Sequence, residues 1–271
     1  MGKMNWFCEE QTPGLKLCFK YRELLHSEET PYQKIEVYDT EEYGRILLLD
    51  GKVMLTEKDG FIYHEMLVHP AMGYLKKREK VVIIGGGDGG CLKEVLKYPV
   101  KEVYVVEIDR RVVEVSKKYL PFLASSFDDP RVKVFYEDGY RWLKEREDKF
   151  DLVIVDSTDP VGPAEILFSD EFLRVVSEKS FLYVTQSESP FLHVDFLRDF
   201  LKRVKKYFPY PLVYLAWIPT YPSGMWSFVM GRKRDTDIPD SPPPGLRYYT
   251  PRLFEASRVL PVFVWKRLYS P

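Results

Sequence analysis

The sequence is poor in cysteine and histidine, and its positive and negative charges almost cancel. Its three cysteines, Cys8, Cys18 and Cys91, are odd in number and contain no C-x-x-C pair. We therefore interpret all three as small hydrophobic residues in a reducing compartment. With 40 Lys and Arg against 41 Asp and Glu, the composition indicates neither a nucleic-acid surface nor an anionic membrane partner.

Long apolar segments are also missing. The first ten residues, MGKMNWFCEE, lack the apolar core of a signal peptide, and no uninterrupted apolar run has membrane-spanning length. We expect a soluble, cytoplasmic protein. A chain of 271 residues, 45% of them hydrophobic, has room for one large domain and a small one.

Histidine spacing argues against a metal site. His64-Glu65 followed by His69 resembles a zinc motif, but zinc-binding histidines on one helix are four residues apart, and these are five apart. The four histidines form no other ligand cluster in the sequence. We predict that the protein holds no metal.

Residues 1–58 are predicted to form a small antiparallel β domain. Short runs rich in β-branched, leucine and aromatic residues suggest strands, and Asp50-Gly51 between two of them is typical of a two-residue hairpin turn. The four runs are Leu15–Tyr21, Gln33–Tyr38, Arg45–Leu49 and Val53–Thr56. A helix should follow Asp59-Gly60 and be interrupted at Pro70.

From Lys80 onward strands and helices alternate, which predicts a mostly parallel sheet with helices on both faces in a second domain, 59–271. Expected strands are 81–84, 103–108, 132–136, 152–155, 181–185, 213–218 and 227–230. The first ends in the glycine turn GGGDGG, in which Gly85, Gly87 and Gly90 satisfy the dinucleotide fingerprint G-x-G-x-x-G. Asp88 argues against a dinucleotide, because a carboxylate in that turn would repel a pyrophosphate and suits a cationic ligand.

Carboxylates follow each of the first four expected strands of this domain. They are Asp88, Glu107 with Asp109, Asp138, and Asp156 with Asp159. Ligands bind beyond the carboxyl ends of such strands, and a ring of like charges is tolerated there only if the ligands are cationic. Glu107 lies where a carboxylate binds ribose hydroxyls, and Asp138 lies where adenine amines are contacted, so an adenosine-type ligand is predicted.

The loop DSTDPVGPAE has a different character, because Asp156 and Asp159 in it could hold an amine and accept its proton. Other segments supply further polar groups that could help to bind the amine. These are Tyr63, His64, Gln186 and Tyr221.

Several motifs of the chain occur in the same order as in a known protein family. The chain resembles the polyamine aminopropyltransferases, and within them the spermidine synthase group. The motifs span nearly the whole chain: Trp6-Phe7, Tyr32-Gln33, LLLDG, Tyr63-His64-Glu65, VVIIGGGDGG, VEID, EDG, DSTDPVGPAE, IPTYPSG and a C-terminal YY…VLP. The resemblance implies a Rossmann-like, class I methyltransferase-like catalytic domain after the small β domain.

The resemblance also implies roles for individual residues. Decarboxylated S-adenosylmethionine would be a co-substrate, with no cofactor. Its nucleoside part would contact Gln33, Gly85, Gly87, Glu107, Asp138, Gly139 and Pro163. Asp156 would be the general base, and Tyr63 would assist it. The amine and aminopropyl groups would lie among His64, Asp88, Asp156, Asp159, Gln186 and Tyr221.

Several alternatives remain open at this point. Putrescine is the expected acceptor, but agmatine, cadaverine or spermidine would fit the same motifs. An S-adenosylmethionine-dependent methyltransferase shares the sheet and the ribose acid, whereas Asp88 disfavours it; a dinucleotide-dependent oxidoreductase is disfavoured for the same reason. A non-enzymatic polyamine- or nucleoside-binding protein would not need the base Asp156. The resemblance further implies a homodimer or homotetramer through the β domain.

Overall fold

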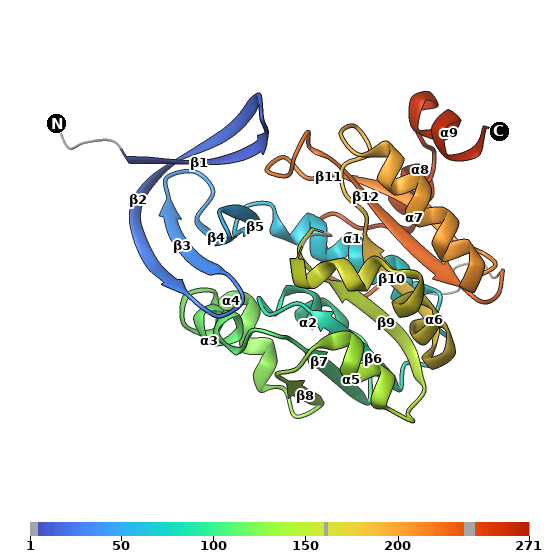
Figure 1. The fold of residues 1–271 in the computed structure, drawn as a ribbon. Helices are drawn as coiled ribbons and strands as arrows, with labels where there is room; N and C mark the ends of the chain where they lie inside the picture. Colours follow the sequence, from blue (N-terminus) through green and yellow to red (C-terminus); the bar gives the residue numbers. More distant parts are fainter. Residues whose placement is uncertain (1–4, 160–161, 236–241, 271) are drawn as a thin grey trace.

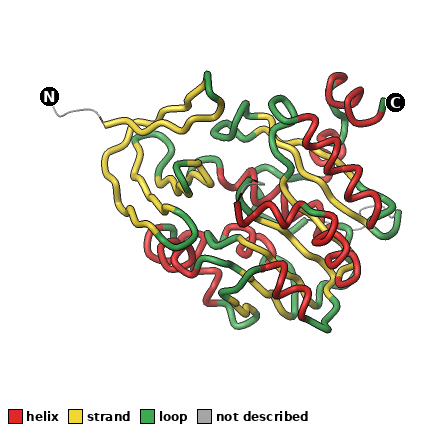
Figure 2. The backbone as a smooth tube through the Cα atoms, in the orientation of Figure 1, coloured by secondary structure: helices red, strands yellow, loops and turns green. Residues whose placement is uncertain are grey.

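The computed structural model describes residues 5–159, 162–235 and 242–270. Two β-sheets organise this part of the chain, a five-stranded one near the N-terminus and a seven-stranded one flanked by helices (Figures 1 and 2). The expected small antiparallel β-sheet and Rossmann-like sheet are both present.

The five-stranded sheet is antiparallel throughout, with its strands in chain order. Its strands are β1 (Asn5–Thr12), β2 (Leu15–Glu29), β3 (Lys34–Thr40), β4 (Arg45–Leu49) and β5 (Lys52–Thr56). Asp50 and Gly51 form the expected turn with φ of 49° and 73°, values that L-residues adopt in a type I′ hairpin turn. Strand β1 was not predicted, because the adjacent charges of Glu9 and Glu10 mask its alternation.

The seven-stranded sheet has the order β11-β12-β10-β9-β6-β7-β8, in which β12 runs antiparallel to β10 and β11 and the other pairs are parallel. The strands are β6 (Lys80–Gly85), β7 (Glu102–Val106), β8 (Val132–Phe135), β9 (Phe150–Asp156), β10 (Ser180–Gln186), β11 (Leu212–Trp217) and β12 (Met225–Arg232). The order reverses direction between β6 and β9, and ligands bind at such a switch point.

Helices cover both faces of this sheet (Figure 1). Successive residues of β6 alternate between the two cores: Val81 and Ile83 face one, and Val82 and Ile84 face the other. The first core includes residues of α1 (Gly60–Gly73), α2 (Gly90–Val95) and α8 (Pro251–Ser257). The second includes residues of α5 (Gly139–Glu145), α6 (Asp170–Lys179), α7 (Val194–Tyr207) and α9 (Val262–Tyr269). The remaining helical segments are α3 (Arg110–Tyr119), α4 (Pro121–Ala124), η1 (Ser125–Asp128) and η2 (Gly162–Phe168).

The prediction that Pro70 interrupts its helix is wrong, because α1 continues through it to Gly73. Proline lacks the N–H that would bond the carbonyl four residues earlier. Tyr214 of β11 replaces it: its hydroxyl donates to the Met66 carbonyl at 2.9 Å. Tertiary packing thus supplies the hydrogen bond that the sequence removes.

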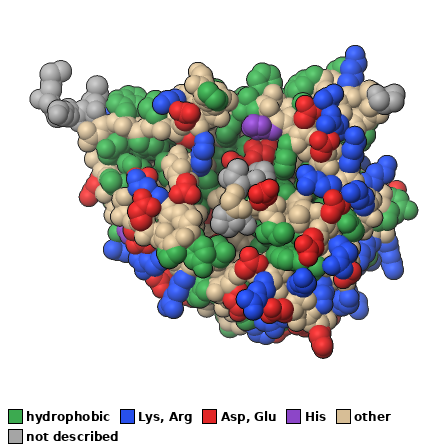
Figure 3. All heavy atoms as spheres, in the orientation of Figure 1, with side chains coloured by type: hydrophobic (Ala, Val, Ile, Leu, Met, Phe, Trp, Pro, Cys, Tyr) green, Lys and Arg blue, Asp and Glu red, His purple; other side chains and the backbone are tan. Residues whose placement is uncertain are grey.

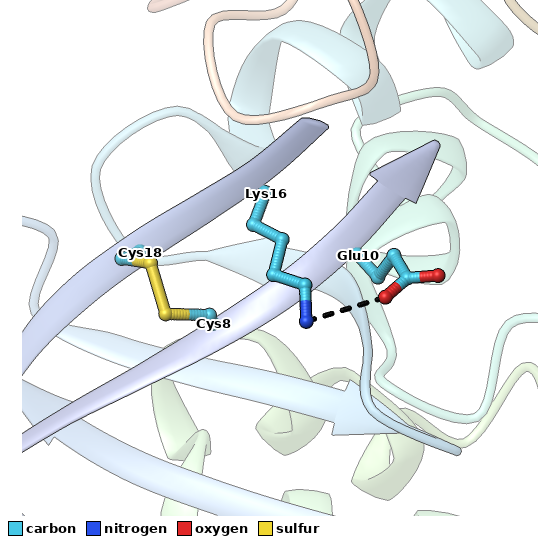
Figure 4. Close-up of a disulfide and its surroundings, with 4 residues drawn as sticks. All are labelled: Cys8, Glu10, Lys16 and Cys18. Carbon is cyan, nitrogen blue, oxygen red and sulfur yellow. Dashed lines mark ion pairs between the residues drawn. A yellow bond between two sulfur atoms is a disulfide. The ribbon is translucent and has the colours of Figure 1, made fainter. Parts of the chain in front are cut away.

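The interpretation of all three cysteines as reduced is also wrong. Cys8 of β1 and Cys18 of β2 form a disulfide across the hairpin, whereas Cys91 is free and buried (Figure 4). The two residues are directly paired in the strand register. Both lie on the exposed side of the hairpin, while their neighbours Glu9 and Phe19 are buried. Spacing alone could not show that ten residues of chain fold back into this pairing.

In the described ranges, no helix combines the length and the apolar character that crossing a membrane requires.

Candidate active site

The glycine turn folds against the carboxyl end of β9. Gly85 and Gly86 have φ of 80° and 70°, values that favour glycine. The Gly86 N–H donates to the Asp156 carbonyl at 2.8 Å. The turn therefore brings Asp88 and Asp156 together, although 68 residues of sequence separate them.

His64 of α1 lies directly on this turn. Its Nε2 is 3.3 Å from Asp88 Oδ1, and the same carboxylate oxygen accepts the Gly90 N–H at 2.5 Å. A Cβ on Gly90 would overlap the imidazole ring. Position 90 must therefore be glycine because the His64 ring leaves no room for a side chain. In a dinucleotide site the corresponding glycine is needed for close helix–strand packing.

Asp156 lies at the centre of the site, between α1 and the glycine turn. Its Oδ1 accepts the Tyr63 hydroxyl at 2.9 Å. Its Oδ2 is buried, and among the described residues it has no hydrogen-bond partner. Burial, followed by the charge of Asp88, raises the pKa of Asp156 to about 6. A buried carboxylate oxygen without a partner is costly, so this atom is poised to accept a donor from a ligand.

The neighbouring residues His64 and Asp88 differ from Asp156, because their surroundings favour the charged forms of both side chains. Burial opposes charge on both groups, but the attraction between them raises the pKa of His64 and lowers that of Asp88. The contact between them therefore favours the imidazolium–carboxylate form of this pair. Three ligand-type atoms of His64, Asp88 and Asp156 lie within 4.8 Å of one another. The statement that the histidines form no ligand cluster is thus wrong, because the fold assembles one from distant segments. The absence of a metal stays a prediction.

Glu107 follows β7 on the other side of the glycine turn. It is buried, and its Oε1 accepts the Asp109 N–H at 2.9 Å. Burial raises its pKa to about 7. A Cβ on Gly87 would lie 2.9 Å from Glu107 Oε2, so this glycine keeps the carboxylate accessible beside the turn.

The remaining predicted nucleoside contacts are spread around the same edge. Gln33, between β2 and β3, donates through Nε2 to Asp109 Oδ2 at 3.2 Å and so ties the N-terminal sheet to the site. Asp138 caps α5, accepting the Arg141 N–H at 2.7 Å. Gly139 packs against Ile84, where a Cβ would overlap the isoleucine. The side chain of Pro163, in η2, lies outside the described part of the structure.

A pocket opens next to Tyr63 on the side away from the glycine turn. Residues from both sheets line it: Glu9, Lys52, Val53, Met54, Tyr63, Ser157, Thr158, Asp159, Gln186, Tyr221, Pro222 and Trp226. Tyr221 stands between its two ends, since its ring is 5.6 Å from that of Tyr63, and Asp156 and Asp159 are both charged neighbours. Its hydroxyl donates to the Met54 carbonyl at 2.6 Å. The space-filling view shows acidic side chains gathered near the middle of this face (Figure 3).

The structure brings three further charged residues to this region. Glu9 and Lys52 line the pocket from β1 and β5, and Glu188, which follows β10, is a charged neighbour of the lining residue Asp159. Sequence reasoning missed all three. Glu9 and Lys52 lie in strands whose partners were unknown. Glu188 points toward Asp159 from a backbone with φ of 61°, which no sequence rule assigns to glutamate.

Buried carboxylates hold this framework in place. Glu65 accepts the N–H groups of Arg247, Tyr248 and Tyr249 at 2.8–2.9 Å. Asp59 Oδ2 accepts the N–H and hydroxyl of Thr220 at 3.1 and 2.8 Å. The motifs Tyr63-His64-Glu65, IPTYPSG and the C-terminal YY are thus connected around one helix. The site can hold a cation at Asp156, with the buried carboxyl group of Glu107 on one side and an acidic pocket on the other.

Comparisons with protein families agree with this geometry. Residues 60–240 match the spermine/spermidine synthase domain, and residues 5–57 match the spermidine synthase tetramerisation domain. A polyamine aminopropyltransferase of Thermoanaerobacter sp. (strain X514) is 45% identical over 267 residues, covering 96% of each chain. One from Moorella thermoacetica is 43% identical over 274 residues, covering 98% of this chain and 97% of the relative.

Solved structures show the same fold. A spermidine synthase crystallised with the transition-state analogue AdoDATO superposes with a TM-score of 0.93 at 35% identity, covering 98% of this chain and 95% of the other. The spermidine synthase of Thermotoga maritima superposes with a TM-score of 0.91 at 34% identity, covering 98% and 94%.

Proposed function

The chain belongs to the spermine/spermidine synthase family, whose curated relatives are polyamine aminopropyltransferases, and on this premise we propose that it makes spermidine. It transfers the aminopropyl group of decarboxylated S-adenosylmethionine to putrescine and releases 5′-methylthioadenosine. The observation that carries the proposal is the buried, unpartnered Oδ2 of Asp156, whose carboxylate is hydrogen-bonded to Tyr63, a residue that lines an acidic pocket. No cofactor or metal takes part.

The nucleoside occupies the glycine-turn side of the site. Glu107 accepts hydrogen bonds from the ribose hydroxyls, and Gly85 and Gly87 let the ligand approach the backbone. The other nucleoside contacts come from Gln33, Asp138, Gly139 and Pro163. The aminopropyl ammonium lies beside Asp88, where a dinucleotide would place its phosphates. The amine acceptor enters through the pocket, along Tyr221, Gln186 and Asp159.

The reaction is a single displacement. The acceptor nitrogen gives its lone pair to the aminopropyl carbon next to the sulfonium, and a C–N bond forms. The C–S bond breaks, its electron pair remains on sulfur, and neutral methylthioadenosine leaves. The attacking nitrogen becomes positively charged and gives its proton to the Asp156 carboxylate. Tyr63 orients that carboxylate through its 2.9 Å hydrogen bond.

Proton transfer explains why the base is buried. An alkyl ammonium has a pKa of about 10, so exposing its lone pair at pH 7 costs roughly 4–5 kcal/mol. An aspartate with an ordinary pKa of about 4 is a weak base. Burial raises the pKa of Asp156 to about 6, which makes it a better acceptor for the proton that is released as the bond forms. Holding the amine in line with the sulfonium carbon supplies the rest of the acceleration.

The proposal is tested by incubating the enzyme with decarboxylated S-adenosylmethionine and a panel of amines, and identifying products by mass. We expect spermidine from putrescine, with methylthioadenosine released in equal amount. Preference for agmatine, cadaverine or spermidine would replace putrescine but keep the transferase. Failure with every amine, together with methyl transfer from S-adenosylmethionine, would overturn it.

The role of Asp156 has its own test. Asp156→Asn keeps the size of the side chain and removes the base, and we expect at least a 100-fold lower kcat. Asp128→Asn is the matched control, because Asp128 is exposed and pairs only with Lys117 at the surface. Near-full turnover by a folded Asp156→Asn variant would exclude the general base assigned here.

Assembly and location complete the proposal. We propose a homodimer or homotetramer formed through the five-stranded sheet, since this segment matches the tetramerisation domain and exposes Trp6, Leu15 and Leu24. Light scattering on the purified protein measures the oligomer. We propose a cytoplasmic location, and there the Cys8–Cys18 disulfide would be unusual outside hyperthermophiles. Cell fractionation of the native source tests it.

A further inference from the structure

The pocket also holds a set of charged groups around Asp159 to which the proposed reaction has not yet given a role. Glu9, Asp159 and Glu188 have Lys52 as a shared charged neighbour. Asp159 and Glu188 are also charged neighbours of each other, and their repulsion adds to burial in raising the pKa of Glu188.

Two buried groups of the pocket lack partners. Within the part of the chain that the structure describes, Glu9 Oε2 and the Trp226 indole N–H are buried without a hydrogen bond. Both residues are 3% exposed and line the pocket. Burial raises the pKa of Glu9 to about 7 and that of Glu188 to about 8. These groups therefore form a prepared but incompletely satisfied polar site.

Lys52 is fixed at this site by the fold. It is the first residue of β5, directly after the Asp50-Gly51 turn, and pairs with Leu49 of β4. Its ammonium donates to the Glu10 carbonyl of β1, next to Glu9. The lysine thus connects two strands and places one permanent positive charge in a pocket that binds amines.

The balance of charge between Lys52 and the nearby carboxyl groups indicates a function for this lysine. Three carboxyl groups and one ammonium lie in this part of the pocket. Burial raises the pKa values of Glu9, Asp159 and Glu188, so these groups carry less negative charge than three free carboxylates would. Lys52 offsets part of the negative charge that remains. That balance suits the one distal ammonium of a diamine better than the two further ammonium groups of a triamine.

We propose that Lys52 is a specificity-determining residue that limits the number of positive charges an acceptor amine can bring to this part of the pocket. This inference rests on the proposed function, because it concerns the acceptor of that same reaction. Lys52 acts as a built-in ammonium: it occupies part of the acidic site and leaves room for one charge from the ligand. Removing it should favour amines with an additional ammonium.

The test separates charge from length. 1,7-Diaminoheptane and bis(3-aminopropyl)amine have equal chain lengths, but the second carries an additional central ammonium. Their dissociation constants are measured by calorimetry, and their inhibition constants are measured against putrescine. For Lys52→Met, which keeps the side-chain length without the charge, we expect the triamine to gain at least 10-fold over the diamine relative to the wild type. Lys52→Arg should keep the wild-type ratio.

Lys16→Met is the matched control. Lys16 belongs to the same hairpin, is 59% exposed and pairs with Glu10 at 3.3 Å on its outer side (Figure 4). Its removal should leave the ratio unchanged. An unchanged ratio in Lys52→Met, or an equal change in Lys16→Met, would overturn the inference. Lack of turnover with every amine would instead refute the proposed function, while calorimetry would still report on Lys52.

Discussion

Two glycines of the turn should affect the two substrates separately. In Gly90→Ala the new methyl group would overlap the His64 ring, and the ring must move away from Asp88. In Gly87→Ala the methyl group would lie 2.9 Å from Glu107 Oε2 and close to Val112. The first substitution therefore disturbs the amine side of the site, and the second disturbs the ribose side.

The size of each effect follows from these contacts. The His64 ring is buried at 3% exposure, so it cannot swing into solvent, and it must shift by about 1 Å or more. A displacement of that size costs on the order of 100-fold in rate, or about 2.7 kcal/mol of transition-state stabilisation. Overpacking should also destabilise the fold by about 1–3 kcal/mol. For Gly87→Ala the carboxylate can rotate, so we expect a roughly 10-fold higher KM for the nucleoside and a smaller change in kcat.

Steady-state kinetics with each substrate varied in turn, together with circular dichroism, measures both effects. Gly14→Ala is the control, since a Cβ there meets nothing within 4 Å. Wild-type kcat in a folded Gly90→Ala protein, or identical kinetic defects in the two variants, would refute the assignment of the two glycines to different substrates.

Four further predictions concern protonation and stability. Activity should fall as the pH is lowered through about 6, where Asp156 becomes protonated. The ligand-free protein should instead become more stable between pH 8 and pH 6. Folding raises the pKa values of Glu9 and Glu107 to about 7 and of Glu188 to about 8, so the folded state binds more protons there than the unfolded state, whose carboxyl groups have pKa values of about 4. Urea unfolding at several pH values would contradict this if stability rose with pH across that window. Tyr214→Phe leaves the Met66 carbonyl without its donor and should lower the free energy of unfolding by about 1–3 kcal/mol, whereas a Tyr210→Phe control at an exposed site should change little. Reduction of the Cys8–Cys18 disulfide, which closes a loop with a sequence separation of 10, should cost about 3 kcal/mol in the chain-entropy description; a melting temperature unaffected by reductant would show that the bridge does not contribute.

Most of the fold could be predicted because its strands carry their own signals. The runs of β-branched residues in β6 and β9 are buried on both faces, so they are continuous and easy to recognise. Strand β1 was not predicted, because the charged residue Glu9 is buried next to the exposed Glu10, and alternation rules do not expect a buried charge. The path of α1 through Pro70 was not predicted, because the compensating hydrogen bond comes from Tyr214, 148 residues after the Met66 carbonyl that accepts it. The disulfide was not predicted, because the pairing of two cysteines across a hairpin depends on the strand register.

The site residues that could be predicted are those that lie directly after a strand. Asp88, Glu107 and Asp156 follow strands of one sheet, and the topology alone brings them together. Glu9, Lys52 and Glu188 were not predictable, because their meeting depends on how the small sheet folds over the larger one. The residue roles proposed from family motifs stay predictions until the variants are measured.

The contact between Glu65 and residues 247–249 also constrains when the enzyme can become active. Glu65 lies on the helix that carries Tyr63 and His64, and its partners lie 182–184 residues later in the chain. During synthesis Glu65 cannot form these hydrogen bonds until residues 247–249 have left the ribosome. Closing so long a loop also carries an entropic cost that grows with its length. Helix α1 is therefore completed only after residues 247–249 have been made, and a chain that stops before residue 247 should have its strands but no finished site.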